Sequence, residues 1–383
     1  MLGASSLGKL SDHLTTPTAK EPKAAWSFNR VTEYDGTQGY LQTEPMAKAP
    51  DHSELLEMFG YDPKEVRIVG LLKTSKWQQR EDGDFLHSYR FSLAPASTSS
   101  MDEILALINK RKYTPPKSEG TAIYHWLAGD LQLGKIDGDG TQGIVDRVLS
   151  SIDKGVIEFK QLRKFNKIGL VHQAWLGDCG EGNQSQGGKL MWRTELTITE
   201  QYRLFRRLAL YAIDAFAPYI ERLEIDVVNG NHDDAQRMPV LTRSDDGHAT
   251  EALIALADGL ALNPATYGHV KIFVPNMDEM TLTREIGDSI FTHAHGHQWG
   301  KGKAFDWWAG QALNNHSPAA SQFLLHGHEH EFKIQSKKDR TQICVPTFES
   351  ESTYWRERHG DVAKTGAVSM ITENQEFTNL SIL

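Results

Sequence analysis

The chain has 383 residues, enough for one large domain and a smaller one, and its 39% hydrophobic and 24% charged fractions are ordinary for a folded protein. Its 41 Lys and Arg stand against 50 Asp and Glu, and this net charge of -9 argues against a protein that binds DNA through bulk positive charge. No run of about 18 apolar residues occurs, so the sequence predicts no transmembrane helix.

The beginning of the chain and its cysteines bear on the compartment. The N-terminal residues lack a basic segment followed by an apolar one, which is unlike a secretory signal. Cys179 and Cys344 lie far apart in unrelated local sequences, which suits reduced thiols better than a disulfide. We therefore expect a cytoplasmic protein with no membrane partner. The sequence does not indicate an oligomeric state.

The first third of the chain predicts two regions. Residues 1–50 are rich in Ser, Thr, Ala, Lys, Pro and Gly without sustained periodicity, so we expect a loosely ordered arm. Residues 51–112 predict a small α+β module: a capped helix that stops at Gly60, two strands joined at Asp82-Gly83, and a second helix. The paired prolines that follow are typical of a linker.

Residues 120–383 predict an α/β domain. Apolar strands end at Asp130, Asp178 and Asn231, and helical patterns separate them over roughly residues 141–164 and 199–220. Near-continuous apolar strands that alternate with helices indicate a sheet covered on both faces. The segments after residue 270 are richer in strands.

Polar residues follow the predicted strands at the points where open α/β sheets place their ligand sites. In chain order they are Asp130 and Gln132 in AGDLQLGK, Asp178 in LGDCGEG, Asn231 and His232 in NGNHDD, His295 in THAHGH, and His328 and His330 in HGHEH. A single motif of this kind is more often a turn or an ordinary polar group. Together, carboxylate, amide and imidazole groups from separate loops are what a pair of divalent metals requires.

This ordered series resembles the calcineurin-like metallophosphoesterases, whose motifs run Asp-x-His, Gly-Asp, Gly-Asn-His, His-Gly and Gly-His-x-His along a two-sheet α/β sandwich. The resemblance covers approximately residues 120–350 and is strongest at Gly-Asn-His-Asp and Gly-His-Glu-His. It implies that fold, and a phosphoesterase that uses two metals to activate water for in-line attack on phosphorus.

The resemblance also implies a role for each residue. Asp178 would bridge the two metals; the first would also bind Asp130, His330 and Gln132, and the second Asn231, His295 and His328. His232 would lie beside the scissile phosphate as a proton donor to the leaving group or a stabiliser of transition-state charge. His295 precedes Gly296 as in the family pattern, which favours it over His293 and His297.

Gln132 departs from the family pattern, which has His at this position. An amide oxygen binds hard ions such as Mn²⁺ or Mg²⁺ but is a poorer ligand than imidazole for softer metals. We therefore expect two divalent ions, with Mn²⁺ preferred and Mg²⁺, Fe²⁺ or Zn²⁺ as alternatives. Two further interpretations are that the first metal binds only with substrate and that turnover is residual.

A weaker resemblance concerns the substrate. The segments Asp-Leu-Gln-x-Gly-Lys, SKWQQ and Gly-Asp-x-x-Glu-Gly are similar to those of phage-encoded metallophosphoesterases described as SbcD-like DNA exonucleases. This implies a phosphodiester substrate in nucleic acid, in the host cytoplasm if the chain is phage-encoded. The alternatives are a phosphodiesterase or phosphatase for small molecules such as cyclic nucleotides, and a metal-binding protein with reduced turnover. Trp355 lies between polar residues and is a candidate for a substrate-facing lid that could stack on a base. Arg356 is a candidate contact to the substrate phosphate, for which an exposed loop charge is at least as good an interpretation.

Overall fold

The computed structural model describes residues 31–34, 39–46, 51–63, 66–78, 85–95, 101–184, 194–237, 240–351, 356–357, 360 and 364–383. It divides into two compact units, Met1–Ser100 and Met101–Leu383, each with its own hydrophobic core. No helix in these ranges is both long enough and apolar enough to cross a bilayer.

The first unit is a four-stranded antiparallel sheet with one helix. In spatial order its strands are β1 (Val31–Tyr34), β2 (Gly39–Gln42), β4 (Phe85–Pro95) and β3 (Val66–Gln78). Helix α2 (His52–Met58) buries Leu55 and Leu56 against Leu41 and Phe91 of this sheet. The predicted helix and the predicted strand pair are confirmed, while the turn at Asp82-Gly83 lies outside the described residues.

The structure divides the chain differently from the sequence prediction. Strands β1 and β2 lie within residues 1–50, where the sequence predicts an arm, because pairing of β2 with β4 orders a segment that has no strong local pattern. Helix α3 (Met101–Lys110) falls in the second unit rather than in the module of residues 51–112. Its Ile104 and Ile108 are buried in the core of the second unit.

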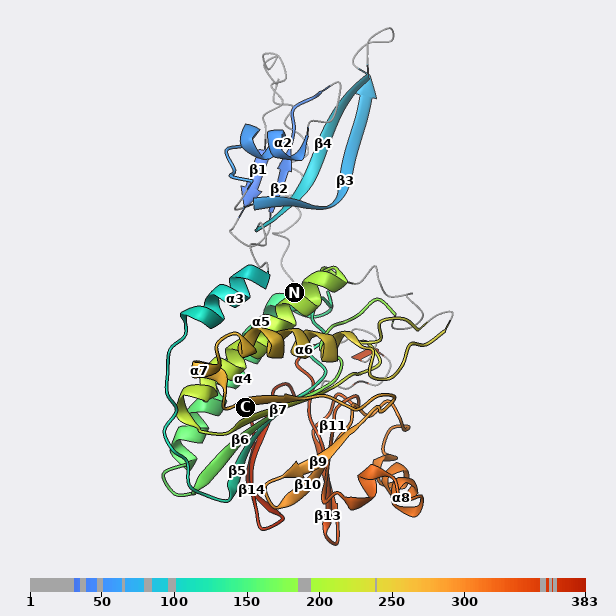
Figure 1. The fold of residues 1–383 in the computed structure, drawn as a ribbon. Helices are drawn as coiled ribbons and strands as arrows, with labels where there is room; N and C mark the ends of the chain where they lie inside the picture. The colour runs from blue at the N-terminus through green and yellow to red at the C-terminus, as the bar shows by residue number, and fades with distance from the viewer. Residues whose placement is uncertain are drawn as a thin grey trace, which may run out of the picture. The chain divides into compact units, whose positions relative to one another are not determined.

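The second unit is a sandwich of two sheets with helices on the outside (Figure 1). One sheet has the order β15-β14-β5-β6-β7-β8 and the other β12-β13-β11-β10-β9. The strands of the first are β5 (Ala122–Ala128), β6 (Ile168–Leu176), β7 (Leu223–Val228), β8 (Val270–Phe273), β14 (Val368–Glu373) and β15 (Glu376–Ile382). Those of the second are β9 (Leu282–Ile286), β10 (Ser289–His293), β11 (Phe323–His326), β12 (Lys333–Lys337) and β13 (Arg340–Cys344). The predicted two-sheet α/β sandwich is confirmed.

Helices α4 (Gly140–Leu162), α5 (Ile198–Phe216) and α6 (His248–Ala261) cover one face of the six-stranded sheet, with the short α7 (Pro264–Tyr267) after them (Figure 1). Helix α8 (Ala304–Leu313) packs on the other sheet through Trp308 and Leu324. Both long predicted helices are confirmed, although α5 ends before residue 220 because Pro218 cannot donate an intrahelical hydrogen bond.

Strands β5, β6 and β7 are parallel and buried along their whole length. Along β5, Tyr124 and Trp126 pack toward the helices, while Ile123 and Leu127 pack in the core between the sheets. Because parallel strands point the same way, the loops that follow them emerge at one edge of the sheet. Asp130, one of the predicted ligands, lies in the first of these loops.

Candidate metal centre

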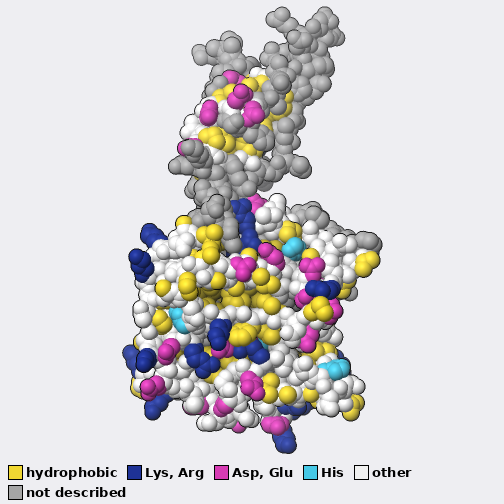
Figure 2. All heavy atoms as spheres, in the orientation of Figure 1, with side chains coloured by type: hydrophobic (Ala, Val, Ile, Leu, Met, Phe, Trp, Pro, Cys, Tyr) yellow, Lys and Arg dark blue, Asp and Glu magenta, His cyan; other side chains and the backbone are white. Residues whose placement is uncertain are grey.

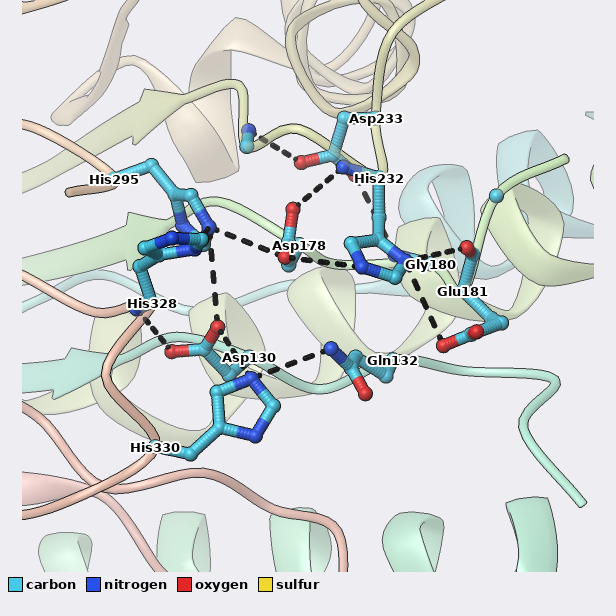
Figure 3. A network of polar contacts seen from close by, with 12 residues as sticks. Asp130, Gln132, Asp178, Gly180, Glu181, His232, Asp233, His295, His328 and His330 are labelled. Carbon is cyan, nitrogen blue, oxygen red and sulfur yellow. Dashed lines mark hydrogen bonds and ion pairs between the residues drawn. The ribbon is translucent and has the colours of Figure 1, made fainter. Parts of the chain in front are cut away.

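The edge formed by these loops gathers the predicted ligands into one cluster (Figure 3). The loops after β5, β6 and β7 and the loops after β10 and β11 contribute Asp130, Gln132, Asp178, His232, His295, His328 and His330. Asn231 lies beside His232 in the loop after β7. Residues far apart in sequence therefore meet where the motif pattern predicts.

Two predicted substrate contacts are not placed in this cluster. Trp355 lies outside the described residues. Arg356 is exposed, and it forms ion pairs with Glu351 and Glu357. Their proposed contact with substrate stays a prediction.

Two buried carboxylates organise the cluster in the same way. Each has one oxygen fixed by a backbone amide: His328 N donates to Asp130 Oδ2 at 2.7 Å, and His232 N donates to Asp178 Oδ1 at 2.8 Å. The other oxygen faces imidazole: Asp130 Oδ1 lies 3.3 Å from His330 Nε2, and Asp178 Oδ2 lies 3.1 Å from His295 Nε2.

The distances define two neighbouring groups of ligand atoms. Asp178, His295 and His328 offer ligand atoms that all lie within 4.8 Å of one another, and His328 Nδ1 is 3.2 Å from His295 Nε2. Asp130 and His330 form the other group. The groups adjoin, since His295 Nε2 is only 3.9 Å from Asp130 Oδ1. Two adjoining groups of ligand atoms are what a pair of neighbouring divalent ions requires.

Three histidines have Nδ1 fixed as a hydrogen-bond donor by neighbouring oxygens. Nδ1 of His295 donates to the Leu176 carbonyl at 2.8 Å, and Nδ1 of His232 donates to the Glu181 carbonyl at 2.7 Å. Nδ1 of His330 likewise donates to a Glu349 carboxylate oxygen at 2.6 Å. Because these oxygens accept the Nδ1 proton, each ring turns Nε2 toward the carboxylates, which is how metal-binding histidines are usually fixed.

The backbone of the cluster has an unusual conformation. Asp130, Gln132, Asp178, His328 and His330 all have positive φ, between 49° and 70°. This left-handed region is unfavourable for residues with a Cβ and persists where the surroundings impose it, often at functional sites. The chain thus aims these side chains at the cost of local strain.

Glycines beside the ligands are required by close approach. A Cβ at Gly230 would lie 2.0 Å from Asp178 Oδ1, and a Cβ at Gly327 would lie 2.4 Å from Asp130 Oδ2. Neither position could carry a side chain without moving a carboxylate. The Gly residues of the Gly-Asn-His and Gly-His-x-His motifs therefore make room for the ligands.

The carboxylates give the cluster a strong preference for positive charge. Burial by itself lowers the pKa of His295, but the charge of Asp178 outweighs burial and raises the pKa to about 9. In the same way Asp130 and Glu349 raise the pKa of His330 to about 10, against the effect of burial. A divalent cation would meet the same favourable potential.

The buried oxygens also fit a metal. In the described part of the chain, Asp130 Oδ1 and Asn231 Oδ1 are buried and accept no well-aligned hydrogen bond. Buried polar atoms without a partner are uncommon in folded proteins, and a bound ion is one way in which such atoms are satisfied. Carboxylate, amide and imidazole donors together suit a divalent transition metal or Mg²⁺.

The amide of Gln132 lies between Lys135 and His330. Its Oε1, the atom expected to ligate the first metal, accepts a hydrogen bond of 3.0 Å from Lys135 Nζ. Its Nε2 instead lies 3.3 Å from His330 Nε2. The amide oxygen is therefore engaged by a cationic side chain in this arrangement.

Glu349 is a component of the site that no sequence motif identifies. It is buried in the segment after β13, where it accepts a hydrogen bond from His330 and forms an ion pair with Lys135. Burial raises its pKa, but His330 and Lys135 outweigh burial and lower the pKa to about 2. Its sequence context, PTFES, has no feature that marks it as part of a metal motif.

Asp233 is a carboxylate that joins two of the ligand loops. Its Oδ1 accepts from Cys179 N at 3.1 Å and from the Tyr202 hydroxyl at 2.7 Å, and its Oδ2 accepts from Gly230 N at 2.8 Å. Burial and the nearby Asp178 charge raise its pKa to about 6. Its contacts show that it fixes the loop after β6 against the loop after β7.

A second buried group of possible ligands lies between the sheets. His172 Nε2 and His293 Nδ1 lie 3.1 and 3.3 Å from Asp226 Oδ2. Arg284 forms a bidentate ion pair with the same carboxylate, with Nη2 2.8 Å from Oδ1 and Nε 3.0 Å from Oδ2. Because the guanidinium already neutralises Asp226 and would repel a cation, this group is an inter-sheet polar network rather than a metal site. His293 belongs to it, which supports the choice of His295 as the ligand.

Comparisons with known proteins give little beyond this geometry. No protein-family model matches the sequence, and no curated protein matches it. Among solved structures, the chain is similar to an archaeal phosphodiesterase, with 14% identity over 68% of this chain and 99% of that chain and a TM-score of 0.32. It is similar to Vps29 with zinc from Entamoeba histolytica, with 13% identity over 66% and 87% of the two chains and a TM-score of 0.31. It is also similar to a hypothetical protein from Pyrococcus horikoshii, with 9% identity over 68% and 88% and a TM-score of 0.35. Scores this low assign no family, activity or ligand to the chain.

Proposed function

We propose that this chain is a metal-dependent phosphoesterase of the calcineurin-like superfamily that hydrolyses phosphodiesters with two divalent metals. The observation that carries the proposal is the convergence of the ordered motif residues on Asp130 and Asp178, with imidazole Nε2 atoms turned toward both carboxylates. Two adjoining anionic groups with fixed imidazoles are the arrangement that two-metal hydrolysis requires.

The proposed holders of the metals divide between the two groups. Asp130, Asp178 and His330 would hold one ion, and Asp178, Asn231, His295 and His328 the other. When bound, such ions supply neutralisation of phosphate charge and a nucleophilic water at neutral pH. We propose Mn²⁺ as the preferred ion, since Asp and Asn oxygens are hard ligands and imidazole suits transition metals.

His232 is the proposed catalytic side chain. Its Nδ1 proton is committed to the Glu181 carbonyl, and its Nε2 lies 3.8 Å from Asp178 Oδ2, beside the proposed metal ligands. From there Nε2 would donate a proton to the leaving-group oxygen or stabilise charge that develops on the phosphate.

For the substrate we propose a phosphodiester of nucleic acid. The motif similarity to phage-encoded nucleases supports this class, and the net charge of -9 favours the competing class of small phosphodiesters. The drawn face of the second unit carries Lys and Arg side chains interspersed with Asp and Glu (Figure 2). With a net charge of -9, recognition would rest on contacts at the metal centre more than on bulk positive charge.

The test begins with a generic phosphodiester. Mn²⁺-loaded protein is expected to hydrolyse bis-p-nitrophenyl phosphate, and Asp178→Asn is expected to abolish both Mn²⁺ binding and turnover. Asp306→Asn, on an exposed face of α8, serves as the matched control and should behave as wild type. Full activity in Asp178→Asn would reject the site. A panel of single-stranded DNA, duplex DNA, RNA and cyclic nucleotides then decides the substrate; hydrolysis of cyclic nucleotides alone would reject nucleic acid.

A further inference from the structure

Four side chains, one of them His330 of the Asp130–His330 group, form a closed ring of polar contacts. Lys135 Nζ donates to Gln132 Oε1 at 3.0 Å and also to Glu349 Oε2. Glu349 Oε1 accepts from His330 Nδ1 at 2.6 Å, and His330 Nε2 lies 3.3 Å from Gln132 Nε2. Lys135 and Glu349 expose only 14% and 6% of their side chains, whereas His330 exposes 27%.

The ring fixes which end of the Gln132 amide faces the ligand atoms. A lysine ammonium has three donors and no acceptor, so only the amide oxygen can face Lys135. The opposite orientation would set the NH₂ group of Gln132 against the NH₃⁺ group of Lys135, two donors with no acceptor between them. The NH₂ group therefore lies on the side of His330 Nε2, at 3.3 Å, an atom that accepts a hydrogen bond only when it carries no proton.

This orientation bears on metal binding. Since Nδ1 of His330 is committed to Glu349, Nε2 is the ring nitrogen that a metal would use. An amide ligates a metal through its oxygen, whereas Gln132 directs its N–H groups to that place. An N–H group that faces a metal position needs a hydrogen-bond acceptor, and a bound ligand can supply one. The non-bridging oxygens of a phosphate are anionic acceptors that form strong hydrogen bonds of this kind.

We propose that Gln132 is a hydrogen-bond donor to a non-bridging oxygen of the substrate phosphate, and that Lys135 is the positioning residue that fixes its amide. The inference rests on the proposed phosphoesterase function. It replaces the ligand role implied for Gln132 by its motif position. Glu349 fixes the positions of both Lys135 and His330, because it contacts both side chains.

Two substitutions of Gln132 distinguish a hydrogen-bond donor to phosphate from a metal ligand. Gln132→Ala can neither donate a hydrogen bond nor bind a metal. Gln132→Glu keeps the size and the acceptor for Lys135, and supplies a better metal ligand, but it cannot donate when ionised. Binding of Mn²⁺ to metal-free protein and binding of inorganic phosphate would each be measured by calorimetry, alongside turnover of bis-p-nitrophenyl phosphate. Asp130→Ala is the control for sensitivity and should lose one equivalent of Mn²⁺.

We expect both Gln132 variants to bind as many Mn²⁺ equivalents as wild type, with kcat/KM and phosphate affinity lowered by about 10–100-fold, as for loss of a hydrogen bond to a charged group. Lys135→Met should lower phosphate affinity in the same direction, and Lys135→Arg should restore part of it. Loss of one Mn²⁺ equivalent in Gln132→Ala, or wild-type turnover in Gln132→Glu, would overturn the inference. If wild-type protein binds no Mn²⁺, the proposed function fails instead; unchanged phosphate binding in both variants would then still reject the donor role.

Discussion

His330 Nδ1 donates a hydrogen bond of 2.6 Å to Glu349 Oε1, and this contact orients the ring whose Nε2 faces Asp130. Partners of this kind typically change metal affinity by about 10–100-fold when they are removed. We therefore expect Glu349→Ala to weaken the affinity for one of two Mn²⁺ ions by that factor, measured by calorimetric titration. Glu351→Ala, which alters a partly exposed carboxylate paired with Arg356, is the matched control. Equal Mn²⁺ affinities in the two variants would refute the role of Glu349.

His232→Asn should separate metal binding from chemistry. The side chain lies beside the ligands, but it has no metal of its own in the proposed site. We expect Mn²⁺ stoichiometry to be preserved and kcat to fall by about 10²–10⁴-fold, the usual contribution of a positioned proton donor. Since p-nitrophenolate is a good leaving group, the loss should be larger for a dimethyl-phosphate-like ester than for bis-p-nitrophenyl phosphate. An equal loss with both esters would favour charge stabilisation over proton donation.

Two Gly→Ala substitutions should change stability in opposite directions. At Gly230 a Cβ would collide with Asp178 Oδ1, so Gly230→Ala is expected to lower both the melting temperature and Mn²⁺ affinity. At Gly310, inside α8, a Cβ would meet no atom within 4 Å. Gly310→Ala should therefore stabilise the protein by roughly 0.5–1 kcal/mol, the usual preference for alanine in a helix. Thermal unfolding by circular dichroism measures both, and a stabilising effect at Gly230 would contradict the close approach of the two ligand loops.

Asp226→Asn should destabilise the protein most at neutral pH. Burial raises the pKa of Asp226, but His293, His172 and Arg284 outweigh burial and hold the pKa below its ordinary value. A depressed carboxyl pKa contributes stability above the unfolded pKa, about 3.9, and loses it as the pH falls through the folded pKa. Breaking such a buried pair costs about 3–5 kcal/mol.

The difference in unfolding free energy between wild type and Asp226→Asn should accordingly be largest near neutrality and shrink as the pH drops below about 4. Denaturant unfolding at a series of pH values measures it. Asp306→Asn, whose carboxylate is exposed in α8, should show a difference near zero throughout. A difference that grows toward low pH would mean that Asp226 is not ionised in the folded protein.

Much of the second unit could be predicted because its information is local. The strands ending at Asp130 and Asp178 are continuous apolar runs, and the short polar motifs after them occur in an order that predicts their convergence. The parallel strand order brings them to one edge without further assumptions. The cluster in Figure 3 thus follows from features visible in a few residues at a time.

Other parts depend on contacts that no local pattern contains. Strand β2 is ordered by pairing with β4, distant in sequence. Glu349 gains its role only because Lys135 and His330 meet it in space. The amide orientation of Gln132 was likewise beyond a motif comparison, since the motif specifies a position and not the neighbour that engages its oxygen.

The left-handed backbone at Asp130, Gln132, Asp178, His328 and His330 has a consequence for engineering. Glycine would relieve strain at any of these positions, so a screen that rewards only heat resistance would favour changes that dismantle the metal centre. Improved variants should therefore be sought in the helices and outer loops, and each should be assayed for retained Mn²⁺ as well as for melting temperature. The strained loops that carry the proposed metal ligands are thus segments where selection for heat resistance and selection for activity would favour different residues.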